Sequence, residues 1–194
     1  MSKTLIAFFS RADENYFGGA MRYVKVGNTE IVCNLMKDMI DADLFKIEMK
    51  NPYSPVYMTC IDEAKRDLRE KARPELTHYP DSLDGYATVI LAYPNYWGTI
   101  PMAVATFLER YDFTGKTILP LCTNEGSGMG GSEKTIRQCA PGAEVKKGLP
   151  IVLCMHVPLF TENIWMIHER FWRYRWRKFR IVAPPDPSGD YKRQ

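Results

Sequence analysis

The amino-acid sequence predicts an α/β fold in which helices cover both faces of one parallel sheet. Short apolar runs alternate with segments of helical periodicity along most of the 194 residues, and this alternation is typical of βα units. Three of the apolar runs lead into loops of unusual composition, at residues 10–27, 93–99 and 123–132. Since ligands bind beyond the carboxyl ends of the strands in such sheets, we expect these three loops to form one site.

The first half of the chain contains two predicted strands and two predicted helices. The run Leu5–Phe9 is apolar throughout and indicates a buried strand. Apolar residues recur at helical spacing from Ile31 to Ile40, so we expect a helix that begins at residues 28–30. The run Leu44–Met49 predicts a second, weaker strand. A charged helix is predicted next, because Ala64, Leu68 and Ala72 recur at helical spacing on one face. Pro74 ends it.

The second half continues the alternation. Ala87–Ala92 predicts the strongest central strand. A helix begins at Pro101, a position at which a missing N–H group costs little. Lys116–Cys122 predicts the next strand, although Pro120 weakens it. The remaining expected elements are a short helix at residues 132–139, a last strand from residue 145 to about 155 and a last helix from residue 162 to about 179.

Length and cysteine usage narrow the class of protein. The length fits one domain, which we assign to residues 1–182, and residues 183–194 are expected to be a disordered tail because they are rich in Pro, Gly and charge. The five cysteines include no CxxC pair, which argues against a disulfide framework or a zinc site. No apolar run approaches the roughly 20 residues of a membrane helix. We expect a cytoplasmic protein, and we assign no metal ligand and no catalytic acid–base residue.

The charge is unevenly divided along the chain. Residues 170–194 carry eight Lys or Arg and two acidic residues, which leaves a net charge of −3 on the other 169 residues. Basic and aromatic residues interleave at 170–180, as they do in segments that bind nucleic acid or an anionic membrane. A packed helix with Arg side chains extending to solvent, or a change of coding frame near residue 152, would also explain this segment. We expect neither nucleic acid nor an anionic membrane surface as a partner.

The first loop ends in Gly27-Asn28-Thr29 at a helix start. Unpaired N–H groups and the helix dipole suit a phosphate at this position, and Ser10, Asn28 and Thr29 add short polar side chains. The alternative is a plain helix cap by Asn28. The loop contains no GxGxxG fingerprint of a dinucleotide site.

The second and third loops suit a planar ligand. The second, YPNYWGT at residues 93–99, places two aromatic residues beside Pro and Gly, and a planar ring system stacks well on such side chains. The alternative is that Trp97 only packs on the helix that begins at Pro101. The third loop, residues 123–132, has four glycines in ten residues. Because glycine costs conformational entropy, this composition favours close approach of the backbone to a ligand, with a flexible surface loop as the alternative.

Together these loops resemble the FMN-binding loops of the flavodoxin family. The segments that carry the resemblance are FFSR at 8–11, GNTE at 27–30, YPNYWG at 93–98 and CTNEGSG at 122–128, and the resemblance spans about residues 3–150. It implies a flavodoxin-like three-layer sandwich with a five-stranded parallel sheet in the order 2-1-3-4-5. It also implies FMN, with its phosphate on Ser10, Asn28 and Thr29 and its ring between the second and third loops. The implied cofactor-binding residues are Ser10, Arg11, Gly27, Asn28, Thr29, Pro94, Asn95, Tyr96, Trp97, Gly98, Asn124, Gly126, Ser127 and Gly128.

The resemblance leaves several functions open. Compact family members lack an insert like residues 11–26, which we expect to fold over the flavin or to control partner access. The implied function is electron transfer to a redox partner protein or a small-molecule acceptor. One alternative is an FMN-dependent NAD(P)H oxidoreductase that acts on a quinone or a similar small acceptor, and another is a flavin-free protein that binds nucleic acid or other proteins. The acidic body would disfavour a reduced flavin that carries negative charge.

Overall fold

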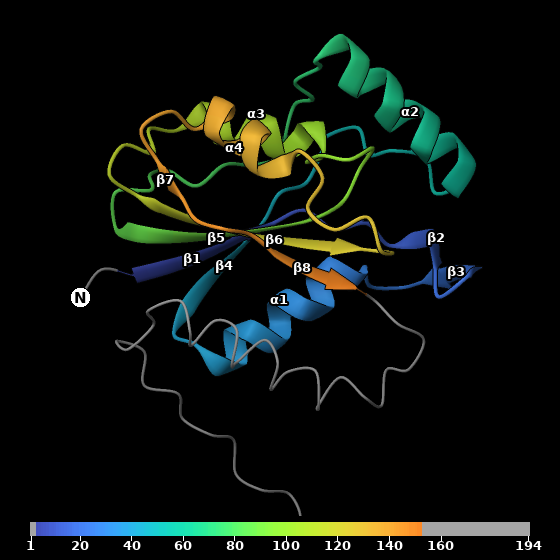
Figure 1. Cartoon of the computed structure of the whole chain (residues 1–194), viewed down its shortest axis with the longest axis horizontal. Helices are drawn as coiled ribbons and strands as arrows, with labels where there is room; N and C mark the ends of the chain where they lie inside the picture. Colours follow the sequence, from blue (N-terminus) through green and yellow to red (C-terminus); the bar gives the residue numbers. More distant parts are fainter. Residues whose placement is uncertain (1–2, 153–194) are drawn as a thin grey trace, which may run out of the picture.

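The computed structural model describes residues 3–152, which form a parallel sheet between helices (Figure 1). All strand pairs in this sheet are parallel. Counted along the chain without the small hairpin, the strand order is 2-1-3-4-5, so the predicted α/β, flavodoxin-like topology is confirmed. Across the sheet the strands follow in the order β4 (Ala42–Lys46), β1 (Lys3–Phe8), β5 (Tyr86–Pro94), β6 (Thr117–Asn124) and β7 (Glu144–Val145), and β8 (Leu149–Val152) also pairs with β6.

The burial of both faces of strand β1 explains why its sequence is apolar throughout. Leu5 and Ala7 belong to one buried cluster, and Ile6 and Phe8 belong to the other, because successive side chains point to opposite faces of a sheet. Helices cover both faces, so both sets must be apolar. Helix α1 (Asn28–Met39) lies on one face, and α2 (Tyr57–Glu70), α3 (Met102–Arg110) and α4 (Ser132–Cys139) lie on the other (Figure 1). None of these helices has both the length and the apolar character of a membrane span.

Several element bounds differ from those predicted. The helix at residues 132–139 is confirmed, whereas the second strand is Ala42–Lys46 and not Leu44–Met49. It begins earlier because its pairing with β1 starts at Ala42. Helix α2 begins at Tyr57 and stops well before Pro74, because Lys71 adopts a left-handed conformation with φ of 52°.

The single strand predicted from residue 145 is wrong, because two short strands occupy this stretch. β7 pairs with Thr117 and Ile118, whereas β8 pairs with the later part of β6. Between them the amide of Gly148 donates to Glu133 Oε1 at 2.6 Å, so the chain leaves the sheet there. The predicted last helix at 162–179 and the tail at 183–194 lie outside the described residues.

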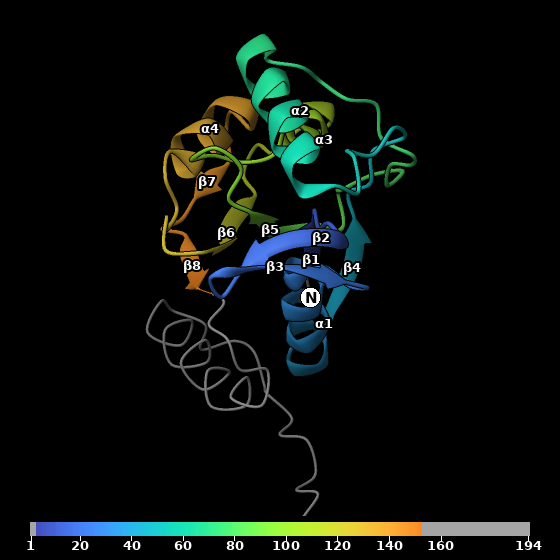
Figure 2. The same cartoon turned by 90° about the vertical axis from the view of Figure 1, so that its right-hand side faces the viewer.

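Residues 13–24 form a β-hairpin for which no strand is predicted from the sequence. β2 (Asp13–Phe17) and β3 (Ala20–Val24) pair antiparallel around Gly18 and Gly19, which have φ of 59° and 76°. A two-residue turn with positive φ at both positions matches the twist of a hairpin, and Gly-Gly adopts it readily. Figure 2 shows this hairpin in front of the central strands, at the edge where β5 and β6 end.

Candidate functional site

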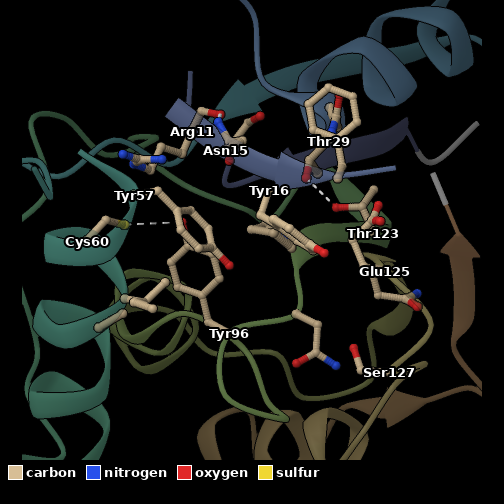
Figure 3. Close-up of a pocket in the computed structure, with 18 of the residues that line it drawn as sticks. Arg11, Asn15, Tyr16, Thr29, Tyr57, Cys60, Tyr96, Thr123, Glu125 and Ser127 are labelled. Atoms are coloured by element: carbon tan, nitrogen blue, oxygen red, sulfur yellow. Dashed lines mark hydrogen bonds between the residues drawn. The ribbon is translucent and has the colours of Figure 1, made fainter. Parts of the chain in front are cut away.

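A cavity of about 330 Å³ opens at the carboxyl edge of the sheet, between the three loops and the hairpin (Figure 3). The three loops therefore converge, as their places after β1, β5 and β6 predict. Gly27, Gly98, Gly126 and Gly128 do not line the cavity but belong to the loops that do. The other predicted cofactor-binding residues all line it: Ser10, Arg11, Asn28, Thr29, Pro94, Asn95, Tyr96, Trp97, Asn124 and Ser127.

The start of α1 packs tightly against the end of β1. Gly27 is the N-cap, and a Cβ atom there would lie 2.3 Å from Ser10 Oγ and 2.4 Å from the carbonyl oxygen of Arg11. Ser10 Oγ accepts a hydrogen bond from the amide of Glu30 at 3.1 Å. Since Gly27 is the N-cap and Asn28 is already helical, the alternative of a plain cap by Asn28 is wrong.

The first turn of α1 presents donors to the cavity. The amides of Asn28 and Thr29 precede the first intrahelical hydrogen bond, which Ile31 N donates to the Gly27 oxygen at 3.2 Å. Such N–H groups have no partner within the helix and carry its positive dipole end. The Thr29 hydroxyl lies deeper, because this residue is 2% exposed and its Oγ1 is 2.8 Å from Thr123 Oγ1 (Figure 3). Both residues of this hydroxyl pair border the cavity.

A tight turn fixes Trp97 at the rim of the cavity. Tyr96 and Thr99 exchange backbone hydrogen bonds of 3.0 and 3.1 Å across it, and Trp97 has φ of 53°. Its Nε1 donates to the carbonyl oxygen of Ile61 at 2.8 Å, and Lys65 Nζ lies 4.8 Å from the centre of the indole ring. These contacts of Trp97 are with α2, whereas the alternative named the helix that begins at Pro101.

Tyr96 points inward and forms a second aromatic surface of the cavity. Its hydroxyl lies 3.9 Å from Cys60 Sγ on α2, and its ring packs edge-on against Phe9 at 6.0 Å between centroids. Burial raises the pKa of Tyr96 well above the usual value of a phenol, and burial also raises the pKa of the Cys60 thiol. Both groups are therefore uncharged at neutral pH.

Hydrogen bonds within the third loop fix its glycines. Asn124 Oδ1 accepts from the amides of Gly126 and Gly128 at 2.9 and 3.0 Å. These glycines have φ of 103° and 63°, values that residues with a side chain rarely adopt. The loop is therefore ordered by its own contacts, which disfavours the alternative of a flexible surface loop. Because both amides are occupied, the two glycines shape the loop and are not its free donors.

The second and third loops form one continuous rim. Asn95 Nδ2 donates to the carbonyl oxygen of Gly128 at 2.9 Å, and Asn95 Oδ1 accepts from the amide of Gly98 at 2.8 Å. The carbonyl oxygen of Gly98 in turn accepts from the amide of Gly131 at 2.7 Å. A Cβ atom at Gly130 would lie 2.2 Å from that same oxygen. Close approach of the two loops therefore requires glycine at residue 130.

The hairpin spans the cavity and is attached on both sides. At its tip the amide of Gly18 donates to Glu125 Oε2 of the third loop at 2.8 Å. At its base Glu14 Oε2 accepts from the amide of Tyr57 at 2.9 Å, and the amide of Glu14 donates to the Pro55 oxygen at 3.2 Å. The insert therefore covers the cavity, whereas its position over a bound flavin stays a prediction.

Several residues that line the cavity were not predicted. The hairpin residues had a local signal in the Gly-Gly pair between two short segments. Those of α2 had none, because the helix reaches the site only through the packing of the fold. The unpredicted lining residues are Asn15, Tyr16, Phe17, Tyr57, Cys60, Ile61, Ala64, Thr123 and Glu125.

Solved structures share this fold. A candidate flavoprotein from Bacteroides uniformis has a TM-score of 0.67 at 24% identity, and the match covers 86% of this chain and 98% of that one. A second, from Bacteroides eggerthii, has a TM-score of 0.65 at 22% identity with the same coverage. A flavoprotein in complex with FMN from Lactobacillus acidophilus has a TM-score of 0.58 at 15% identity, covering 86% of this chain and 99% of that one.

Sequence comparison gives the family. None of the curated proteins matches the chain at a significant level. The family model for flavodoxin matches residues 20–156, well over half of the sequence and including the second and third loops. The chain belongs to the flavodoxin family.

Proposed function

We propose that the protein binds FMN in this cavity and transfers electrons through it. The observation that carries the proposal is the pairing of two kinds of surface around one cavity: a helix N-terminus, and aromatic side chains on the opposite rim. The first suits a phosphate and the second suits a planar ring. Membership of the flavodoxin family and the FMN complex of the Lactobacillus acidophilus protein support the same cofactor.

The residues on the helix side fit a phosphate. Ser10 Oγ accepts from Glu30, so its own proton is free to donate. The Thr29–Thr123 pair needs only one of its two protons for the bond between the hydroxyls, so the other is also free. With the amides of Asn28 and Thr29, these groups would hold a phosphate by hydrogen bonds and the helix dipole, without a cation.

The residues on the rim side fit the ring of the cofactor. Tyr96 and Trp97 offer aromatic surfaces from the second loop, and Tyr16 and Tyr57 add a pair of rings at 6.3 Å between centroids. Bound flavin supplies one- and two-electron chemistry. The protein's own part is to hold the phosphate, to orient the ring and to limit access to it.

The hairpin favours a small-molecule acceptor over a protein partner. A partner protein must bring its redox centre close to the flavin ring, and a hairpin attached on both sides of the cavity stands in its way. A small planar acceptor has less need of an open face. An FMN-dependent NAD(P)H oxidoreductase acting on a quinone or similar compound is therefore our second candidate, beside a dedicated electron carrier.

Binding is tested with the purified full-length chain and three flavins. We expect FMN to bind more tightly than riboflavin or FAD, with a change in the visible spectrum on binding. Equal dissociation constants for riboflavin and FMN would reject the phosphate site at α1. Absence of binding for all three would reject the function itself.

The two candidates are separated by the FMN-loaded protein and NAD(P)H. Rapid oxidation of the nucleotide that depends on an added benzoquinone supports the oxidoreductase. No oxidation under these conditions, together with electron exchange with a small redox protein after chemical reduction, supports the carrier.

A further inference from the structure

Arg11 is a positively charged residue of the cavity whose guanidinium forms no salt bridge with a carboxylate among residues 3–152. Its Nη1 and Nη2 donate to the carbonyl oxygens of Glu14 and Ser54, the second at 2.6 Å. Its Nε is buried and has no hydrogen-bond partner within residues 3–152. The carboxylate of Glu14 binds the amide of Tyr57 instead. Backbone carbonyls thus hold a guanidinium in place without neutralising it.

The Arg11 side chain extends along one side of the cavity. In Figure 3 its guanidinium lies near Tyr57 and Cys60 and points away from Thr29. Thr29 marks the start of α1, where a phosphate would bind. The charge therefore lies on the ring side of the cavity and not on the phosphate side.

The charge of Arg11 affects the ionisation of the neighbouring cavity residues. Burial raises the pKa of Tyr96, and the Arg11 charge opposes that rise. The same opposition acts on the pKa of Cys60 and of Tyr57, which burial also raises. Arg11 thus stabilises negative charge in the part of the cavity where the ring would stack.

We propose that the charge of Arg11 raises the affinity of the cavity for the reduced, negatively charged form of the flavin ring relative to its affinity for the oxidised, neutral form. This inference rests on the proposed FMN function. Two electrons and one proton, taken from a chemical reductant such as dithionite and from water, leave one net negative charge on a neutral ring. A fixed cation beside that ring lowers the free energy of the anion and has little effect on the neutral form.

The charge of Arg11 acts on the cavity at shorter range than the net charge of the body. The net −3 outside residues 170–194 is spread over 169 residues, and exposed charges are screened beyond roughly 10 Å at 0.1 M salt. Glu125 also lines the cavity, but its carboxylate is exposed and accepts from the amide of Gly18. Arg11 is partly buried, so solvent screens it less. Arg11 therefore opposes, at the ring, the effect expected from the net charge alone.

The test compares Arg11→Gln and Arg11→Lys with the unmodified full-length chain. For each protein the dissociation constants of oxidised FMN and of dithionite-reduced FMN are measured by anaerobic titration. In Arg11→Gln the ratio of the affinity for reduced FMN to the affinity for oxidised FMN should fall by about tenfold or more. A tenfold fall corresponds to a two-electron reduction potential of the bound FMN that is lower by about 30 mV. Arg11→Lys keeps the charge but not the two-pronged contact with the carbonyls, and it should retain most of the ratio.

Four outcomes would overturn the inference. If Arg11→Lys loses the ratio as fully as Arg11→Gln, the residue acts by holding the hairpin and not through its charge. If Arg11→Gln weakens both forms of FMN equally and leaves riboflavin binding unchanged, the charge serves the phosphate. If the unmodified chain binds FMN and the ratio of reduced to oxidised affinity is the same in all three proteins, the inference about Arg11 is wrong but the proposed function stands. If the unmodified chain binds neither form of FMN, the proposed function is wrong as well.

Discussion

The hydroxyl groups of Thr29 and Thr123 lie 2.8 Å apart, although 94 residues separate them in the chain. One belongs to the first turn of α1 and the other to the end of β6, so the contact joins the expected phosphate site to the third loop. Either hydroxyl can donate to the other. The pair therefore keeps one proton for a ligand in the cavity.

Thr29→Val should weaken FMN binding, because it removes the hydroxyl and nearly preserves the side-chain shape. A hydrogen bond to a charged phosphate contributes about 1.5–3 kcal/mol, so the dissociation constant should rise roughly tenfold or more. Thr29→Ser keeps the hydroxyl and is the matched control, and isothermal titration compares the two. Equal affinity of the Val and Ser variants would mean that the Thr29 hydroxyl does not bind the phosphate.

Gly27→Ala should reduce both stability and FMN affinity. Its Cβ atom would lie 2.3 Å from Ser10 Oγ and 2.4 Å from the Arg11 oxygen, so the loop and the helix start must separate. We expect a loss of about 2 kcal/mol in the free energy of unfolding. Gly85→Ala is the control, because a Cβ atom there meets nothing within 4 Å, and thermal melting with and without FMN measures both. A Gly27→Ala protein that melts and binds like Gly85→Ala would contradict the tight packing.

Much of the sheet could be predicted because its strands are buried on both faces. The apolar runs of β1 and β5 leave little choice of structure, and the helix at Ser132–Cys139 begins directly after a glycine loop. The hairpin could not be found from periodicity, because Asp13–Phe17 mixes polar and aromatic residues without clear alternation. Its only local signal was the Gly-Gly turn.

The site was predicted where its residues are adjacent in sequence and was missed where packing assembles it. The loops at 27–30 and 93–98 carry local patterns and line the cavity or shape it. The bond from Trp97 to the Ile61 oxygen depends instead on how α2 lies against the second loop. The direction of the Arg11 side chain likewise depends on Ser54, which is 43 residues away. No local pattern encodes contacts of this kind.

Breaking the bond between the hairpin tip and the third loop should speed the release of FMN. Glu125→Ala removes the acceptor of the Gly18 amide. A hydrogen bond to a charged group contributes about 1 kcal/mol or more, so its loss should raise the rate at which FMN dissociates by about fivefold. Glu125→Gln keeps an acceptor and should fall between the Ala variant and the unmodified chain. Stopped-flow release into excess apoflavodoxin from another source gives the rates. Identical rates for all three proteins would mean that the hairpin does not hold the ligand.

FMN should protect Cys60 from alkylation. Cys60 lines the cavity, whereas Cys122 is buried outside it, and burial raises the pKa of the Cys122 thiol to about 12. Because the thiolate is the reactive form, both should react slowly with iodoacetamide at pH 8, but only Cys60 should react more slowly still when FMN is present. Peptide mass spectrometry reports each site separately. Equal labelling of Cys60 with and without FMN would place the ligand elsewhere.

Trp97 and Tyr96 should quench the fluorescence of bound FMN. Both line the cavity, Trp97 at the rim and Tyr96 inside it, and an aromatic ring stacked on a flavin quenches its fluorescence by donating an electron to the excited flavin. Trp97→Ala and Tyr96→Ala should therefore each raise the fluorescence of the bound cofactor and weaken its binding by about 0.5–1.5 kcal/mol, the contribution of one aromatic pair.

Trp97→Phe keeps a ring but loses the hydrogen bond to the Ile61 oxygen, so it separates stacking from anchoring. If Phe binds like Trp, the ring itself is the contact; if Phe behaves like Ala, the anchoring to α2 holds the second loop in place. Bound FMN with unchanged fluorescence in both Ala variants would mean that neither ring touches the flavin, and the rim of the second loop would lose its proposed role.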